Sequence, residues 1–189
     1  MQDHERQLVV DQLTASRDRL LELADGLTAE EWTFRPAEGR WSIGECLEHV
    51  MRVESRMLGV IENKLRESPT GPAGTRVDDA WIAKAVLDRA ARRQAPEAVR
   101  PTGQWPDANE LVAEFRKTRQ RTTDFAATTQ SDLRSYIHPH MALGELDCYQ
   151  WLLLLSLHGA RHAQQIEEIK AAAGFPQPTA SLSPSHPSA

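Results

Sequence analysis

The sequence predicts an all-α protein in which four long helices form a bundle. Apolar residues recur at helical spacing in four long segments, and three of these segments follow a residue that can cap a helix N-terminus. No segment shows strand alternation, a phosphate-binding glycine loop or the nucleophile turn of a serine hydrolase. With 189 residues, 40% of them hydrophobic, the chain is long enough for one domain with a full core.

The first long helix is expected from Asp3 to Asp25, because its apolar residues share one face. Gly26 is the expected terminator, since glycine readily adopts the left-handed conformation that ends many helices. Thr28 and Glu31 then form a capping-box pattern, which predicts one short helical turn that ends before Pro36.

The second long helix is expected to begin after Ser42 and to continue to about Arg66. Ser42 can cap the helix, and Glu45 stands three residues later, where its carboxylate can reach back to the Ser42 amide. His49 lies at the border of the apolar stripe of this helix.

Residues 67–106 connect the second long helix to the third. A helical pattern runs through Asp78–Arg93, between two irregular segments. This stretch of roughly 40 residues is long, because adjacent antiparallel helices are usually joined by about 2–8 residues. The connection is therefore a helical crossover, long enough to cross the bundle and let the second and third long helices run parallel.

The third and fourth long helices are predicted from their caps. The third begins near Asp107, which repeats the capping-box pattern with Glu110. Residues 131–146 are expected to form a loop. The fourth helix is capped at Asp147 and ends at Gly174.

The last 15 residues differ from the rest of the chain. Residues 175–189 are rich in proline and serine, a composition that predicts a disordered tail. The predicted domain is therefore the bundle of residues 1–174.

Composition excludes several classes of function. The net charge is −5 and no basic stripe occurs, so the sequence has no electrostatic footprint for nucleic acid. The longest apolar run, Trp151–Leu155, is far short of a membrane span, and the charged N-terminus does not resemble a signal peptide. The only cysteines, Cys46 and Cys148, have no paired spacing, which suits a reducing compartment. These features predict a cytoplasmic protein without a membrane partner.

Two histidines, His158 and His162, stand on the most apolar face of the fourth helix. Residues four apart lie one above the other on a helix, so both imidazoles can bind the same metal ion. Zinc proteases use this spacing, but there a catalytic glutamate follows the first histidine, and here the next residue is Gly159. Two buried histidines satisfied by hydrogen bonds would also explain the pattern.

A third histidine on another helix would complete a catalytic metal site, which typically uses three protein ligands and leaves one position open. His49 can supply it, unless it merely borders the apolar stripe. His138 and His140 are alternative ligands in a segment that is more typical of a surface loop. Cys46 lies one turn before His49 and is either a fourth ligand or a small core residue.

Two arginines are weaker candidates for a catalytic or substrate-binding role. Arg161 lies between the two histidines of the fourth helix, and Arg119 lies at the edge of the third-helix stripe. Either guanidinium can hold a substrate anion, although a solvated or salt-bridged arginine is the simpler interpretation. A ligating histidine usually donates its other ring nitrogen to an acceptor, and the candidate acceptors near in sequence are Glu45, Glu48, Glu54 and Gln165.

The chain resembles the DinB-like metalloprotein superfamily, of the DinB_2 and YfiT-like kind. The order and spacing of its motifs carry the resemblance, which extends from the first helix to Gly174. The motifs are Trp41–His49 (WSIGECLEH), Ala95–Trp105 (APEAVRPTGQW), Phe115–Arg119 (FRKTR), His138–Gly144 (HPHMALG) and Trp151–Ile166 (WLLLLSLHGARHAQQI).

The resemblance implies a four-helix bundle with up-down-down-up connectivity. It also implies a metal site formed by His49, His158 and His162, with zinc or nickel as the divalent metal, and a homodimer. The helical insert around Trp81 departs from the family pattern and is positioned to cover or reshape the pocket.

The leading functional hypothesis is a metal-dependent enzyme that acts on a small molecule. Three neutral histidines leave the metal with its full charge, which favours a hydrolase. The same site can instead ionise a low-molecular-weight thiol, as in the S-transferases among DinB-like relatives. The alternatives are a non-catalytic metal- or ligand-binding stress-response bundle and a metal-free bundle with hydrogen-bonded histidines.

Overall fold

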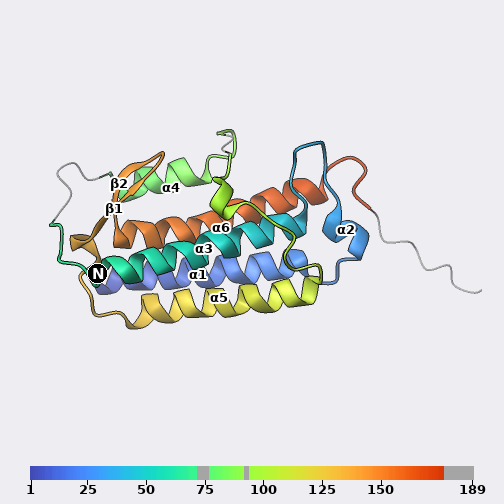
Figure 1. Cartoon of the computed structure of the whole chain (residues 1–189). Helices are drawn as coiled ribbons and strands as arrows, with labels where there is room; N and C mark the ends of the chain where they lie inside the picture. Colours follow the sequence, from blue (N-terminus) through green and yellow to red (C-terminus); the bar gives the residue numbers. More distant parts are fainter. Residues whose placement is uncertain (72–76, 92–93, 177–189) are drawn as a thin grey trace, which may run out of the picture.

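Four long helices lie side by side in the computed structural model, which describes residues 1–71, 77–91 and 94–176 (Figure 1). These are α1 (Asp3–Ala24), α3 (Ile43–Lys64), α5 (Ala108–Thr128) and α6 (Cys148–Lys170). The shorter elements are α2 (Ala29–Thr33), α4 (Asp79–Leu87), the 3-10 helices η1 (Glu97–Val99) and η2 (Leu133–Ser135), and the strands β1 (Ile137–His140) and β2 (Gly144–Asp147). The all-α bundle predicted from the sequence is confirmed.

Polar contacts near the helix ends fix the direction of each long helix. They join Arg6 to the Ala126 carbonyl, Arg19 to Glu167, and Arg121 to Glu62. The first contact makes α1 and α5 antiparallel, and the other two make α1 parallel to α6 and α3 parallel to α5. The four helices therefore run up, down, down and up, and α4 lies along α6 within the crossover (Figure 1).

Four helix starts are capped by the residues that the sequence predicted, although the full capping box expected at Asp107 does not form. Full capping boxes form at Thr28, Ser42 and Asp147. Asp107 caps α5 by accepting hydrogen bonds from two main-chain amides, including that of Glu110. Because each capping oxygen satisfies an amide that has no partner within its helix, these residues fix where the helices begin.

The helices end earlier than predicted. The helices α1, α3 and α6 end at Ala24, Lys64 and Lys170, because the last residues before each terminator form turns. Gly26 and Gly174 both have positive φ, of 67° and 82°, so they do terminate the segments. The length of the crossover helix was overestimated most. The predicted helix continued to Arg93, whereas the observed helix ends at Leu87, and residues 92–93 lie outside the described part of the chain.

The prediction of a loop at residues 131–146 was wrong. The segment contains η2 and a two-stranded antiparallel hairpin in which His138 pairs with Leu146 and Pro139 pairs with Glu145. The strands have four residues each, and proline in the first one obscures a strand pattern, because proline cannot donate a hydrogen bond to a sheet.

The beginning of the predicted tail is packed rather than disordered. The Phe175 ring meets the Phe34 ring edge-on, with 5.5 Å between the ring centroids. Residues 177–189 of the predicted tail lie outside the described residues.

Among the residues that are described, every helix is too short or too polar to span a bilayer.

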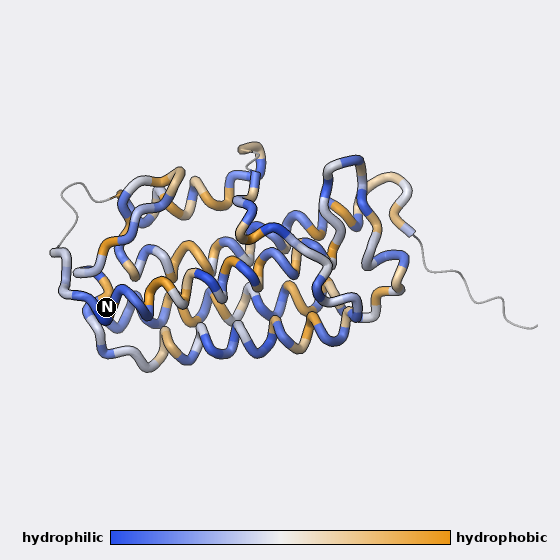
Figure 2. Tube along the Cα trace, viewed as in Figure 1, coloured by the Kyte–Doolittle hydropathy of each residue, from blue (hydrophilic) through white to orange (hydrophobic). Residues whose placement is uncertain are grey.

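A polar layer separates the core into two apolar clusters. One cluster includes Leu13, Ile61 and Leu157, and the other includes Leu20, Leu47 and Ile166. Figure 2 shows apolar residues recurring along each long helix with polar residues between them. The buried side chains of the polar layer are Ser16 on α1, His49 and Glu54 on α3, Arg119 on α5 and His162 on α6. Each long helix contributes to this layer, so it marks the most unusual part of the core.

Gly44 fixes how α2 packs against α3. A Cβ at this position would lie 2.5 Å from Nε1 of Trp32, whereas a Cβ at Gly59 of the same helix would have no neighbour within 4 Å. We expect Gly44→Ala to lower the free energy of unfolding by about 1–3 kcal/mol through overpacking. Gly59→Ala is the matched control and should raise it by about 0.5–1 kcal/mol. Urea unfolding of both variants measures the difference, and equal effects would contradict the close packing.

Candidate metal centre

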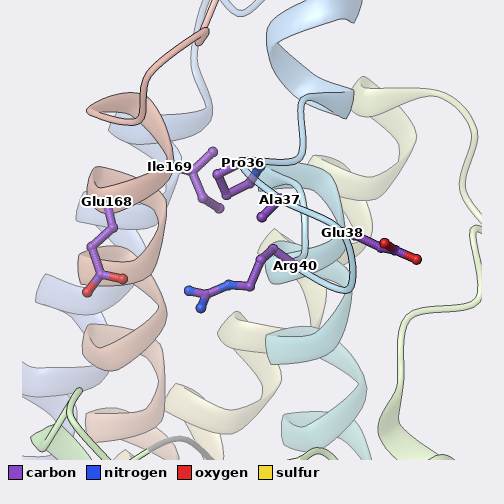
Figure 3. A pocket seen from close by; sticks show the side chains of 6 residues that line it. All are labelled: Pro36, Ala37, Glu38, Arg40, Glu168 and Ile169. Atoms are coloured by element: carbon purple, nitrogen blue, oxygen red, sulfur yellow. The ribbon is translucent and has the colours of Figure 1, made fainter.

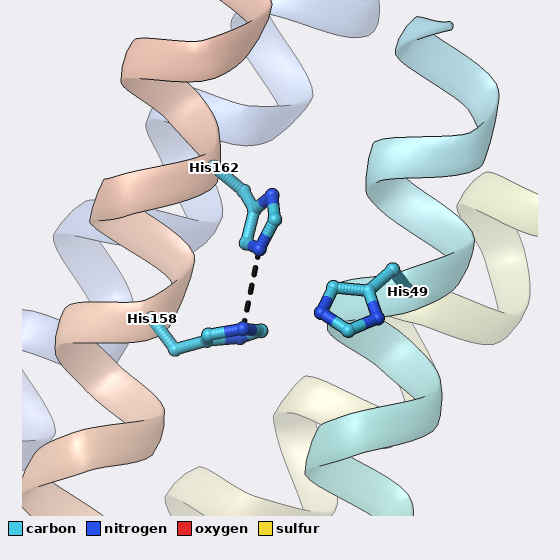
Figure 4. Close-up of side chains that lie close together, drawn as sticks. All are labelled: His49, His158 and His162. Atoms are coloured by element: carbon cyan, nitrogen blue, oxygen red, sulfur yellow. Dashed lines mark hydrogen bonds between the residues drawn. The ribbon is translucent and has the colours of Figure 1, made fainter. Parts of the chain in front are cut away.

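Three histidines from two helices converge in the polar layer. His49 projects from α3, and His158 and His162 project toward it from α6 (Figure 4). One ring nitrogen from each lies within 4.8 Å of the others. His49 and His162 are buried and His158 is half-buried. The predicted juxtaposition of these three residues is therefore present in the fold.

The spacing of the α6 histidines fits a shared metal ion. Nε2 of His158 and Nε2 of His162 are 3.2 Å apart. Two nitrogens that bind one tetrahedral zinc ion at about 2.0–2.1 Å lie about 3.3 Å apart. The same two atoms are also within hydrogen-bond distance, whereas Nδ1 of His162 is buried and has no hydrogen-bond partner among the described residues. The distance between the two Nε2 atoms therefore fits a shared metal ion, and hydrogen bonds within the protein leave the His162 ring only partly satisfied.

The tautomer of His49 is set by the crossover. Its Nδ1 lies 2.8 Å from the Val99 carbonyl oxygen, which can only accept, so Nδ1 carries the proton. Nε2 is then left with a lone pair for a metal. The hydrogen bond also holds the orientation of the ring, as is usual for histidines that bind metals.

The acceptors proposed from the sequence were wrong for His49. Glu45 completes the Ser42 capping box, Glu48 accepts hydrogen bonds from the crossover at Thr102, and Glu54 pairs with Arg119. No side-chain pattern could have indicated Val99, because the acceptor is a main-chain carbonyl that only the path of the chain brings near.

Burial keeps the three imidazoles neutral. It lowers the pKa of His49 to about 4, although the Val99 hydrogen bond acts in the opposite direction. Burial, followed by the charges of neighbouring histidines and arginines, lowers the pKa of His158 and His162 well below its ordinary value. Neutral imidazole is the form that binds metal, so the site does not need to lose protons at neutral pH.

The lowered pKa of His49 predicts the pH dependence of the metal-free protein. Between pH of about 6.5 and 4 the unfolded chain binds a proton at His49 that the folded chain does not. The contribution of His49 to the free energy of unfolding is therefore fully present above pH of about 6.5. It decreases by about 3 kcal/mol as the pH falls toward about 4. Urea unfolding with a chelator at pH of about 7.5 and 4.5 measures this loss.

His49→Gln should show a smaller loss of stability between these two pH values than the wild type. His4→Gln changes an exposed histidine on α1 and is the control. Acidic groups elsewhere add the same background in every variant, so the difference reports His49 together with its effect on the pKa of His158 and His162. An unchanged loss in His49→Gln would contradict the assignment.

The two arginines considered from the sequence are engaged within the fold. Arg119 is fully buried, pairs with Glu54 and donates to the Leu13 carbonyl. Arg161 donates to the carbonyls of Val86, Asp88 and Ala91 and so holds the crossover against α6.

Gly159 allows α6 to approach the polar layer closely. A Cβ on this residue would lie 3.0 Å from the Ser16 hydroxyl and 3.1 Å from Nη2 of Arg119. The glycine that follows His158, where a zinc protease has its glutamate, is therefore explained by packing.

The other candidate ligands lie outside the histidine cluster. Cys46 is buried, and burial raises the pKa of its thiol far above the ordinary value. His138 and His140 belong to β1 and pack against the Trp151 ring, at 5.7 and 5.1 Å between ring centroids. Among the described residues, no cysteine or carboxylate joins the three histidines, so a metal there would keep an open position.

Trp41 is a site residue that the sequence analysis did not assign. Its ring lies 4.6 Å from the His49 ring and stacks on the His162 ring at 6.1 Å, measured between centroids. The only signal in the sequence was a tryptophan directly before the Ser42 cap, inside the motif that also contains His49. The half-buried indole forms an apolar wall beside the centre.

The crossover is anchored beside the centre from both helices. On α3, Glu48 accepts hydrogen bonds from Thr102 and Gly103, and His49 binds Val99. On α6, Arg161 binds Asp88. The crossover thus contributes directly to the surroundings of the histidines, mainly through the family-like segment Ala95–Trp105.

Comparison with known proteins agrees with this architecture. Uncharacterized protein YuaE of Bacillus subtilis (strain 168) is 24% identical over 145 residues, which cover 77% of this chain and 86% of YuaE. A solved structure of YfiT from Bacillus subtilis, described as a probable metal-dependent hydrolase with an unusual four-helix bundle topology, aligns with a TM-score of 0.64 and 15% identity over 93% of this chain and 91% of YfiT. The DinB superfamily matches residues 12–166, which is well over half of the chain. The chain therefore belongs to the DinB superfamily.

Proposed function

We propose that His49, His158 and His162 hold a divalent metal ion, zinc or nickel, and that the protein is a metal-dependent hydrolase of a small molecule. The observation that carries this proposal is the set of three neutral imidazoles without a fourth protein ligand among the described residues. The description of YfiT as a probable metal-dependent hydrolase supports the same reaction class.

The donor set limits the metal. Imidazole nitrogen suits zinc and nickel, whereas magnesium and calcium prefer oxygen ligands. When bound by three neutral ligands, such a metal polarises a substrate oxygen and lowers the pKa of a water or thiol in its open position.

The protein residues would orient the reaction and shield it. The Val99 carbonyl fixes the His49 ring, so the ligand does not need to reorient when a substrate arrives. Trp41 covers one side of the histidines and excludes water there. The crossover, held by Glu48 and Arg161, closes a second side and can shape the substrate pocket.

Two assays with protein loaded with zinc or nickel test the reaction. A panel of esters and amides without thiol should be hydrolysed by the loaded protein, and not after chelation or in His162→Ala. A second panel combines electrophiles with a low-molecular-weight thiol, and metal-dependent conjugation there would replace the hydrolase by a thiol S-transferase. One metal per chain without turnover in either panel would reject the enzyme and favour a metal-binding bundle.

A further inference from the structure

A cavity of about 380 Å³ lies between the end of α6 and the loop that leads into α3. Figure 3 shows the Arg40 side chain extending from this loop toward α6. The lining residues are Pro36, Ala37, Glu38, Arg40, Glu168 and Ile169. Neither the sequence motifs nor the histidine cluster account for this cavity.

Arg40 is the unusual member of the lining. It is half-buried, and its guanidinium has no hydrogen-bond or ion-pair partner among the described residues. The neighbouring guanidiniums are engaged: Arg89 forms a bidentate pair with Glu168, and Arg161 binds crossover carbonyls. A half-buried arginine directed into a cavity without a partner is suited to an anion from outside the protein, since its planar donors match carboxylate and phosphate.

Trp41 connects the cavity residue Arg40 to the three histidines along the chain. This residue follows Arg40 directly, and its ring contacts both His49 and His162. On the other wall, Ile169 lies two turns after His162 on α6, which is about 10 Å along the helix axis. A small molecule held by Arg40 would therefore have to extend over about 10 Å, past the Trp41 ring, to reach the histidines.

The charge around the cavity favours an anion although the chain as a whole carries −5. Arg40, Arg89 and Arg161 all act on Glu168 and lower its pKa, with the Arg89 hydrogen bond as the largest cause. Glu38 is exposed, and its carboxylate is directed away from Arg40 (Figure 3). Arg89 already forms a bidentate pair with Glu168, so among the described residues Arg40 is the cavity guanidinium that has no carboxylate of its own.

We propose that the Arg40 cavity binds the anionic group, a carboxylate or a phosphate, of the small molecule whose reacting end lies at the three histidines. The anion site stands on the cavity and on Arg40 alone. The link between this site and a reaction rests on the proposed function. For that function, the site specifies the substrate class as a small molecule with an anionic group.

Anion titration of the full-length, zinc-saturated protein tests the site. Sulfate serves as the phosphate-like probe and acetate as the carboxylate probe, followed by two-dimensional ¹H–¹⁵N NMR. We expect saturable shifts of the Arg40 Nε–H and the Trp41 indole N–H for at least one probe. Arg40→Gln should weaken binding by at least about tenfold, and Arg40→Lys should retain part of the affinity. Arg17→Gln removes a half-buried guanidinium that is paired with Asp18, and should leave binding unchanged.

The outcomes separate this proposal from the metal-dependent function. Absence of saturable shifts, or equal weakening in Arg40→Gln and Arg17→Gln, would overturn the anion site and leave the metal centre untouched. The same titration in His158→Ala should retain the Arg40 shifts, because the cavity does not include the histidines. Shifts confined to the histidine rings would mean that the probe binds the metal, which also counts against the Arg40 site.

Discussion

The wild-type chain is expected to bind one metal ion per chain, and the His158→Ala variant is expected to lose it. Removal of this imidazole leaves two ligands on two different helices, and the affinity should fall by more than about 100-fold. Elemental analysis after purification without chelators, followed by zinc titration, measures the loss. His138→Ala is the matched control, because His138 lies in the hairpin outside the histidine cluster. Metal retained in His158→Ala, or absent from both proteins, would contradict the centre.

In the His158→Ala variant, added zinc should no longer stabilise the folded protein. A ligand that binds only the folded chain stabilises it by about 4 kcal/mol at 1,000 times its dissociation constant. Added zinc should therefore raise the melting temperature of the wild type and of His138→Ala, but not that of His158→Ala. An equal rise in all three proteins would show that zinc binds elsewhere.

Arg119→Met is expected to destabilise the bundle by about 3–5 kcal/mol, because it leaves Glu54 buried without its partner. Both side chains are almost completely buried, at 0% and 1% exposure, and Nε of Arg119 lies 2.9 Å from the carboxylate. Arg121→Met, two residues later on the same helix, breaks an exposed pair with Glu62 and should cost at most about 1 kcal/mol. Urea unfolding of the two variants gives the comparison, and a similar cost for both would refute the importance of burial.

Replacement of both partners separates the cost of an unpaired charge from the value of the pair. In Glu54→Met/Arg119→Met no charge remains buried, so most of the stability lost in Arg119→Met should return. A double variant as unstable as the single one would instead indicate that the hydrogen bonds of Arg119 to Leu13 and Ser16 dominate.

Within the polar layer the buried ion pair lies next to the helix segment that carries two of the three histidines. Arg119 packs against Gly159, which directly follows the ligand His158. The α6 backbone next to His158 is therefore packed closely against the buried Arg119 side chain. Catalytic sites depend on such support, because small displacements of a ligand change its geometry strongly.

Local sequence rules determined the long helices and their starts. Periodicity identified the four helices, and capping oxygens at Ser42 and Asp147 fixed where two of them begin. These features could be predicted because they depend on residues at most one or two turns apart. The spacing of His158 and His162 on one helix face is determined in the same way, and the match to the motif containing His49 supplied the third residue.

Only the tertiary structure decided how the centre is supported. Three features depend on segments that are distant in sequence: the hydrogen bond of His49 to the Val99 carbonyl, the ion pair of Arg119 with Glu54, and the cavity that Arg40 lines. The hairpin at residues 137–147 likewise could not be predicted from its strands, because each has only four residues and the first contains a proline. Periodicity and capping are physical properties of a local segment, whereas a partner for a buried polar group is chosen by how the whole chain packs.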